Sequence, residues 1–122
     1  MSAPVQYQAL SAEAIREQLR GFPAETVEAA LRFQSEGSLA AFKTMLPGFI
    51  EFHLPRGTPK PPAVLDDHLR LNQDLGLDSL ALSEMAFKLD ELFGVTIETR
   101  EVTGITTVAE LLAFLKTKFD LE

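Results

Sequence analysis

The chain reads Asp74-Leu75-Gly76-Leu77-Asp78-Ser79-Leu80 just before an amphipathic helix predicted over residues 80–93. Apolar side chains recur there at 3.6-residue spacing, as expected for a helix that buries one side. Asp78 suits the N-cap, where a short carboxylate accepts a backbone N–H, and Gly94 suits C′, where a positive φ is needed. The buried stripe is predicted to contain Leu82, Met85, Ala86, Leu89, Leu92 and Phe93.

The opposite side of this predicted helix carries two large apolar residues, Leu80 and Phe87. They are flanked by the acidic side chains of Glu84, Asp90 and Glu91. Isolated exposed apolar residues are ordinary on protein surfaces, so one interpretation is incidental exposure. The other is a docking face with an acidic rim that attracts basic partners, and its position next to Ser79 favours this interpretation.

These motifs, together with Phe93-Gly94-Val95 and Ile105-Thr106-Thr107-Val108, resemble those of acyl carrier proteins over roughly residues 46–119. The resemblance implies that Ser79 bears 4′-phosphopantetheine through a phosphodiester, with Asp78 flanking it. A separate Mg-dependent transferase, the holo-carrier-protein synthase, would supply the group from coenzyme A. A phosphodiester there would lie at the positive end of a helix dipole, which favours it.

The resemblance further implies a carrier that holds acyl intermediates as thioesters on the prosthetic thiol. The chain itself has no cysteine to supply one. The expected partners are acyl ligases, ketosynthases or acyltransferases of fatty acid, specialised lipid or polyketide biosynthesis. A fatty chain could enter a core pocket formed by Met85, Leu89, Phe93, Ile97, Ile105, Leu111 and Phe114. The alternatives are an aminoacyl or peptidyl carrier, and an unmodified module for protein interaction.

Two positions depart from the family pattern in charge, and Phe87 stands where a smaller or more flexible apolar residue is usual. Ala81 and Lys88 are expected on the exposed half of the helix, where family members often carry acidic residues. Lys88 is expected to pair with Glu84 one turn earlier, since oppositely charged residues four apart are neighbours on a helix. Both changes weaken the negative field, which argues against recognition by the most general fatty-acid synthase partners.

Nothing in the sequence predicts catalysis. Gly76-Leu77-Asp78-Ser79-Leu80 differs from the Gly-Asp-Ser-Leu hydrolase signature because Leu77 intervenes. The two histidines, His53 and His68, have no recognisable triad context. His53 is expected to be a partly buried helix residue, and Asp66-Asp67-His68 a solvated polar patch rather than a metal site.

The net charge of −7 comes entirely from residues 61–122, which carry twelve acids and five bases, whereas residues 1–60 carry six of each. This distribution argues against nucleic acid or an anionic membrane as a partner. No run approaches the roughly 18 apolar residues of a membrane span, and the first four residues lack the features of a signal peptide. The expectation is a cytoplasmic monomer.

The predicted fold is all-α, a four-helix bundle of the acyl carrier type (residues 46–122) with additional N-terminal helices (residues 1–45). Ser11 caps the first helix and Gly21 ends it; Pro23 is N1 of a second helix that buries Val27, Ala30 and Leu31 and ends at Gly37. Ser38 caps a third, which Pro47-Gly48 interrupts, so that residues 47–54 form the first carrier helix.

A long loop follows over residues 55–78, anchored by Val64, Leu65, Leu69, Leu71 and Leu75. Residues 99–105 are predicted to form a short helix. Thr107 and Glu110 form a capping box for the last helix, which buries Leu111, Leu112, Leu115 and Phe119. The extension either packs on the bundle or serves as a docking element for a dedicated partner.

Overall fold

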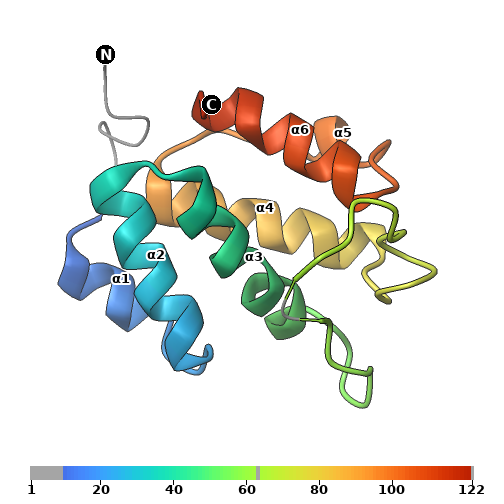
Figure 1. Ribbon diagram of the computed structural model, residues 1–122, viewed down its shortest axis with the longest axis horizontal. Coiled ribbons are helices and arrows are strands. Elements are labelled where there is room, and N and C mark those ends of the chain that lie inside the picture. The colour runs from blue at the N-terminus through green and yellow to red at the C-terminus, as the bar shows by residue number, and fades with distance from the viewer. Residues whose placement is uncertain (1–9, 63, 122) are drawn as a thin grey trace.

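The computed structural model describes residues 10–62 and 64–121, so the N-terminal stretch considered for a signal peptide lies outside it (Figure 1). Within these ranges the chain forms helices alone, joined by loops and one isolated antiparallel bridge. The helices are α1 (Ala12–Gln18), α2 (Ala24–Glu36), α3 (Leu39–Phe52), α4 (Ser79–Phe93), α5 (Thr99–Val102) and α6 (Val108–Phe119). The predicted all-α class is confirmed.

Ser11 and Gly37 cap the N-terminal helices as predicted, but α1 ends earlier than predicted, at Gln18 with Leu19 as its C-cap, so that Gly21 lies in the following turn. The Ser11 hydroxyl accepts from the Ala14 amide at 3.2 Å, and Gly37 ends α2 in the left-handed conformation. Pro23 is the N-cap of α2 rather than N1, because its ψ of 145° is extended. The predicted buried side of α2 was rotated: Thr26, Ala29, Ala30 and Phe33 are buried, while Val27 and Leu31 are only half-buried.

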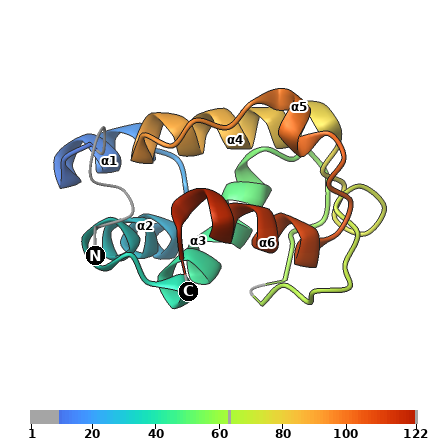
Figure 2. The same cartoon turned by 90° about the horizontal axis from the view of Figure 1, so that it is seen from above.

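Helix α3 is continuous, so the predicted interruption at Pro47-Gly48 was wrong. The physical reason is a close approach of α2. A Cβ added to Gly48 would lie only 1.8 Å from Oγ1 of Thr26, so the glycine makes room for a neighbouring helix. Helices α2 and α3 lie side by side in Figures 1 and 2. The boundary expected between residues 45 and 46 therefore falls inside one helix.

Helices α1 and α2 of the predicted N-terminal extension share one hydrophobic core with α4 and α6 of the carrier region. Phe33 of α2 is fully buried, and its ring centroid lies 5.2 Å from Phe42 of α3, 5.1 Å from Phe93 of α4 and 5.2 Å from Phe119 of α6. The edge-on and tilted geometries are those that aromatic quadrupoles favour. We call these four rings the aromatic cluster.

The C-terminal helices follow the prediction with three corrections. Helix α5 ends at Val102 instead of extending to residue 105. Thr107 caps α6, but the Glu110 carboxylate accepts from the amide and hydroxyl of Thr106 instead of the Thr107 amide, so the predicted capping box is not formed. Leu111, Leu115 and Phe119 are buried as predicted, while Leu112 is half-buried.

The loop before α4 is anchored less widely than predicted. Leu71 and Leu75 are buried, and Leu65 and Leu69 pack partly against the core. Val64 is 85% exposed, so it does not anchor the loop in the core. In the described part of the chain, no helix is long and apolar enough to cross a membrane.

Candidate functional site

The segment that leads into α4 is held by backbone hydrogen bonds to the connection before α6. The Leu71 amide donates to the Thr106 carbonyl at 2.8 Å, and the Val108 amide donates to the Leu69 carbonyl at 2.9 Å. These bonds flank the bridge between Arg70 and Thr107. A loop paired in this way presents the start of α4 in a defined position.

Within that segment three residues of the opening motif have structural roles. The Asp74 carboxylate accepts from the Arg70 amide at 2.7 Å and closes the turn. Gly76 has φ of +80°, a left-handed conformation that glycine adopts without steric cost. Leu77 is buried, and its amide donates to the Leu71 carbonyl at 2.7 Å. The motif therefore fixes the chain immediately before Ser79.

Ser79 is the first residue of α4 and is exposed. In the described residues no hydrogen bond engages its hydroxyl. The Oδ1 atom of Asp78 accepts from the Ala81 amide at 2.8 Å, which confirms the predicted N-cap. Ser79 is thus an outward hydroxyl at the amino end of a capped helix.

The side of α4 that follows Ser79 carries a stripe of exposed residues. Leu80 is 68% exposed and Phe87 is 64% exposed, and the exposed Glu84 and Glu91 lie on the same side of the helix. Asp90, also predicted on this face, is half-buried. We call Leu80, Glu84, Phe87 and Glu91 the α4 stripe.

Ala81 and Lys88, the two positions of α4 predicted to weaken its negative charge from the exposed half, differ from the prediction. Ala81 is buried rather than exposed, because it lies on the inner side of the helix in the first turn. The Lys88 ammonium lies 3.4 Å from a carboxylate oxygen of Glu91 and donates to Oε1 of Gln18 at 3.2 Å, instead of pairing with Glu84. Figure 2 shows α1, which ends at Gln18, beside α4.

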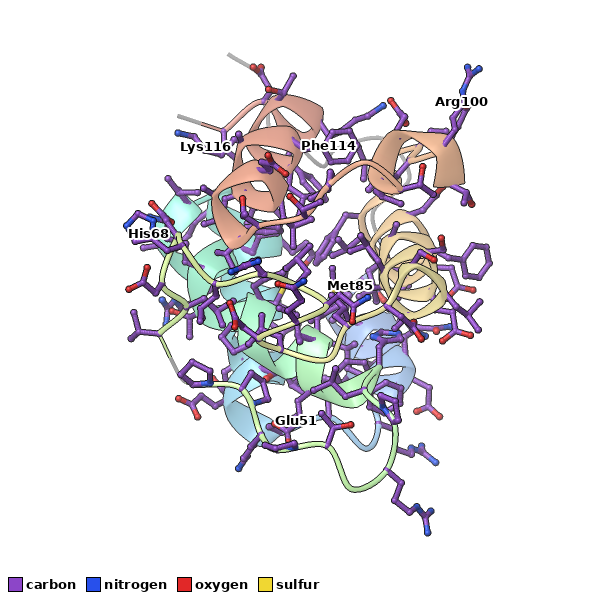
Figure 3. All side chains as sticks on the ribbon, turned by 90° about the vertical axis from the view of Figure 1, so that its right-hand side faces the viewer. Glu51, His68, Met85, Arg100, Phe114 and Lys116 are labelled. Atoms are coloured by element: carbon purple, nitrogen blue, oxygen red, sulfur yellow. The ribbon has the colours of Figure 1, made fainter. Side chains whose placement is uncertain are left out.

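The residues expected to line an acyl pocket are closely packed core residues. Met85, Leu89, Phe93 and Leu111 are buried, while Ile97, Ile105 and Phe114 are half-buried against them. Figure 3 shows Met85 on the inner side of α4 and Phe114 between α6 and α5. The structure therefore brings these residues together, but neither of the two cavities described below contains any of them.

Two surface cavities were not anticipated from the sequence. The larger, of about 590 Å³, lies among α2, α3 and the 60–67 loop. The smaller, of about 420 Å³, lies between the end of α3 and the outer side of α4. We call the smaller cavity the α3–α4 groove; its walls are Phe52, His53, Ser83, Glu84, Phe87, Lys88 and Glu91. Both depend on helix packing that leaves no local sequence signal.

Residues 58–115 match the family described as "Phosphopantetheine attachment site". This match spans the anchored loop, the motif and most of α6. Residues 58–115 are a phosphopantetheine attachment domain. Such a domain carries 4′-phosphopantetheine covalently and is not itself catalytic.

Several curated acyl carrier proteins are similar to part of this chain. The one from Exiguobacterium sp. is 40% identical over 45 residues, which cover 37% of this chain and 57% of that protein. One from Rickettsia bellii is 38% identical over 48 residues (39% and 59%), and one from Nitratidesulfovibrio vulgaris is 37% identical over 46 residues (38% and 60%). The chain thus spans less than two thirds of these relatives' lengths. No solved structure matches it significantly.

The attachment domain contains two serines, Ser79 and Ser83. Ser79 is exposed at the helix start, whereas Ser83 is half-buried one turn later. The two histidines lie apart from both serines in sequence and have other roles. His53 is the C-cap of α3, with Nδ1 at 2.8 Å from the Phe49 carbonyl oxygen, and the His68 amide donates to the Asp66 carboxylate.

Proposed function

We propose that Ser79 is the attachment point of 4′-phosphopantetheine and that the arm carries acyl groups as thioesters. The observation that supports this most is the exposed Ser79 hydroxyl at the first residue of α4, directly after a loop held by the motif. The name that the similar proteins share, acyl carrier protein, favours acyl cargo.

The attachment step is a phosphoryl transfer from coenzyme A. The Ser79 oxygen forms a bond to the phosphorus that bears pantetheine, the bond to the second phosphate breaks, and 3′,5′-ADP leaves. The serine proton is released in the same reaction. When bound, the arm supplies the thiol that forms a thioester with an acyl group. The chain itself has no cysteine and therefore cannot supply this thiol.

The surroundings of Ser79 fit such a group. A helix amino end carries partial positive charge and amides that can face an anion, and Asp78 already satisfies the Ala81 amide. The phosphodiester would stand outward, since Ser79 and Leu80 are both exposed. The expected partners are a holo-carrier-protein synthase and acyl ligases, ketosynthases or acyltransferases of fatty acid, specialised lipid or polyketide synthesis.

Intact-mass analysis tests this proposal. Incubation of the full chain with coenzyme A, Mg²⁺ and a broad-specificity transferase should add one phosphopantetheinyl group. Ser79→Ala should abolish the addition while it leaves the thermal melt unchanged, because the Ser79 side chain is exposed. Ser83→Ala is the matched control and should still be modified. Modification that persists in Ser79→Ala, or none in the folded wild type, contradicts the proposal.

A further inference from the structure

The α3–α4 groove lies between two exposed aromatic residues from different parts of the chain. Phe87 of α4 is 64% exposed and Phe52, the last residue of α3, is 48% exposed. A groove with aromatic rings on two sides can hold an apolar side chain of a partner and exclude water around it. Phe52 lies before the matched domain of residues 58–115.

The N-terminal extension positions the second wall of this groove. The Phe22 ring, in the turn between α1 and α2, stacks on Phe52 with centroids 4.0 Å apart and planes within 10°. Phe22 is itself buried and also contacts Phe49, at 5.2 Å. The stacking limits the orientations open to Phe52, so the shape of the groove depends on residues outside the attachment domain.

The charge at the groove is predominantly negative. Glu84 and Glu91 line it and are exposed. The Lys88 ammonium is directed to Glu91 and to Gln18 of α1. Within residues 10–62 and 64–121, Glu84 on the same wall forms no ion pair with a lysine. This arrangement favours a partner whose apolar side chain is flanked by arginine or lysine.

The groove is within reach of any enzyme that acts on Ser79. With a rise of 1.5 Å per residue, Ser83 lies about 6 Å and Glu91 about 18 Å along α4 from Ser79. A protein that brings a catalytic centre to Ser79 is therefore close enough to contact the α4 stripe and the adjoining groove as well. A standard protein interface buries about 800 Å² on each partner, which is enough surface to include this length of α4.

We propose that the α3–α4 groove receives a basic-flanked apolar side chain of the transferase that modifies Ser79, with Phe52 as the second wall held by Phe22. This inference rests on the proposed attachment at Ser79. It extends the docking surface from α4 to the end of α3 and gives the extension a role in partner recognition.

Steady-state modification by a bacterial holo-carrier-protein synthase tests the role of Phe52. Phe52→Ala and Phe87→Ala should each raise the KM for the carrier about tenfold, as for a truncated interface anchor, and change kcat less than about twofold. Phe52→Leu should restore most of the affinity, since it keeps an apolar wall. Val64→Ala, at an exposed position outside the groove, is the control and should leave KM unchanged.

Titration of ¹⁵N-labelled Ser79→Ala with the same synthase reports docking without modification. Amide signals of Phe52, His53, Ser83 and Phe87 should shift or broaden together. Shifts confined to α4, or equal KM values for wild type and both alanine variants, would overturn the role of Phe52. A concentration-dependent dimer abolished by Phe87→Ala would assign the groove to a second copy and also overturn the inference. A failed modification with intact titration shifts would instead contradict attachment at Ser79.

Discussion

At the scale of single residues, Glu110 links α6 to the segment that precedes Ser79. Its carboxylate accepts from the Thr106 amide at 2.8 Å and from the Thr106 hydroxyl at 3.0 Å. The Thr106 carbonyl in turn accepts from the Leu71 amide, which belongs to the anchored loop. A single exposed carboxylate therefore supports the pairing that holds the start of α4.

These bonds make the stability of the protein depend on pH. The hydrogen bonds from Thr106 lower the pKa of Glu110 below 4.5, its ordinary value. A depressed pKa contributes stability that is fully present above the unfolded-state value and is lost as pH falls through the folded-state value. The contribution of Glu110 is therefore complete at neutral pH and declines in acid below about 4.5.

Glu110→Gln should flatten this acid dependence, because the amide oxygen can still accept both bonds from Thr106 but does not titrate. Urea unfolding at pH 7 and at several values below 4.5 measures the difference. Glu28→Gln, which removes an exposed carboxylate from α2, is the control for the loss of one surface charge. Identical pH profiles for Glu110→Gln and the wild type would show that the bonds to Thr106 carry no such linkage.

At the scale of helices, α3 and α4 show what local sequence can and cannot predict. The ends and inner stripe of α4 follow from Asp78, Gly94 and 3.6-residue spacing, and all are confirmed. In α3 the pair Pro47-Gly48 has the composition of a helix break, yet Gly48 serves contact with Thr26, which is 22 positions earlier in the sequence. The continuity of α3 is therefore determined by its tertiary contact with α2 and not by its local sequence.

The same distinction applies to the candidate site. Ser79 and Asp78 occupy the positions that their local motif predicts. The partner of Lys88 was missed, because Gln18 is brought to it from 70 positions away. The wall formed by Phe52 was missed for the same reason, since neither Phe22 nor the end of α3 carries a local signal for a groove.

The contact between α2 and α3 leads to a prediction about Gly48. Gly48→Ala should destabilise the protein by about 1–3 kcal/mol, the usual range for overpacking, because the new Cβ would overlap the Thr26 side chain. Equilibrium unfolding in urea measures the loss. Gly104→Ala is the matched control: a Cβ there meets nothing within 4 Å, so its effect should be much smaller.

A double-mutant cycle identifies the cause. Thr26→Ala removes Oγ1 and Cγ2 but leaves Cβ, which lies 2.7 Å from the added methyl. The double variant should therefore recover part of the loss, so that the two single effects are not additive. Strict additivity would mean that the helices do not approach as closely as the geometry of Thr26 and Gly48 requires.

At the scale of the whole molecule, the extension and the attachment domain form one packed body. Phe33 of the extension is the ring that Phe42, Phe93 and Phe119 share. A backbone bond also joins the two parts, since the Leu10 amide donates to the Leu92 carbonyl at 3.3 Å; within the extension, the Gln34 side chain donates to the Leu10 carbonyl. The extension therefore packs on the bundle, the first of its two predicted roles, and its contact with Phe52 is compatible with the second.

Phe33→Ala should consequently destabilise the entire chain, not only its N-terminal helices. A buried phenylalanine truncated to alanine costs about 3–5 kcal/mol, a large part of the 5–15 kcal/mol typical of a small domain. Phe87→Ala, which truncates an exposed ring on α4, should change stability by less than about 0.5 kcal/mol. Far-UV circular dichroism and tryptic cleavage, followed through the same urea transition, measure both. In a contradicting outcome, Phe33→Ala would unfold the N-terminal helices in a separate early step while α4 and α6 remain folded. Phe93 and Phe119 would then still be packed without the Phe33 ring, so the shared core would not unfold as a single cooperative unit.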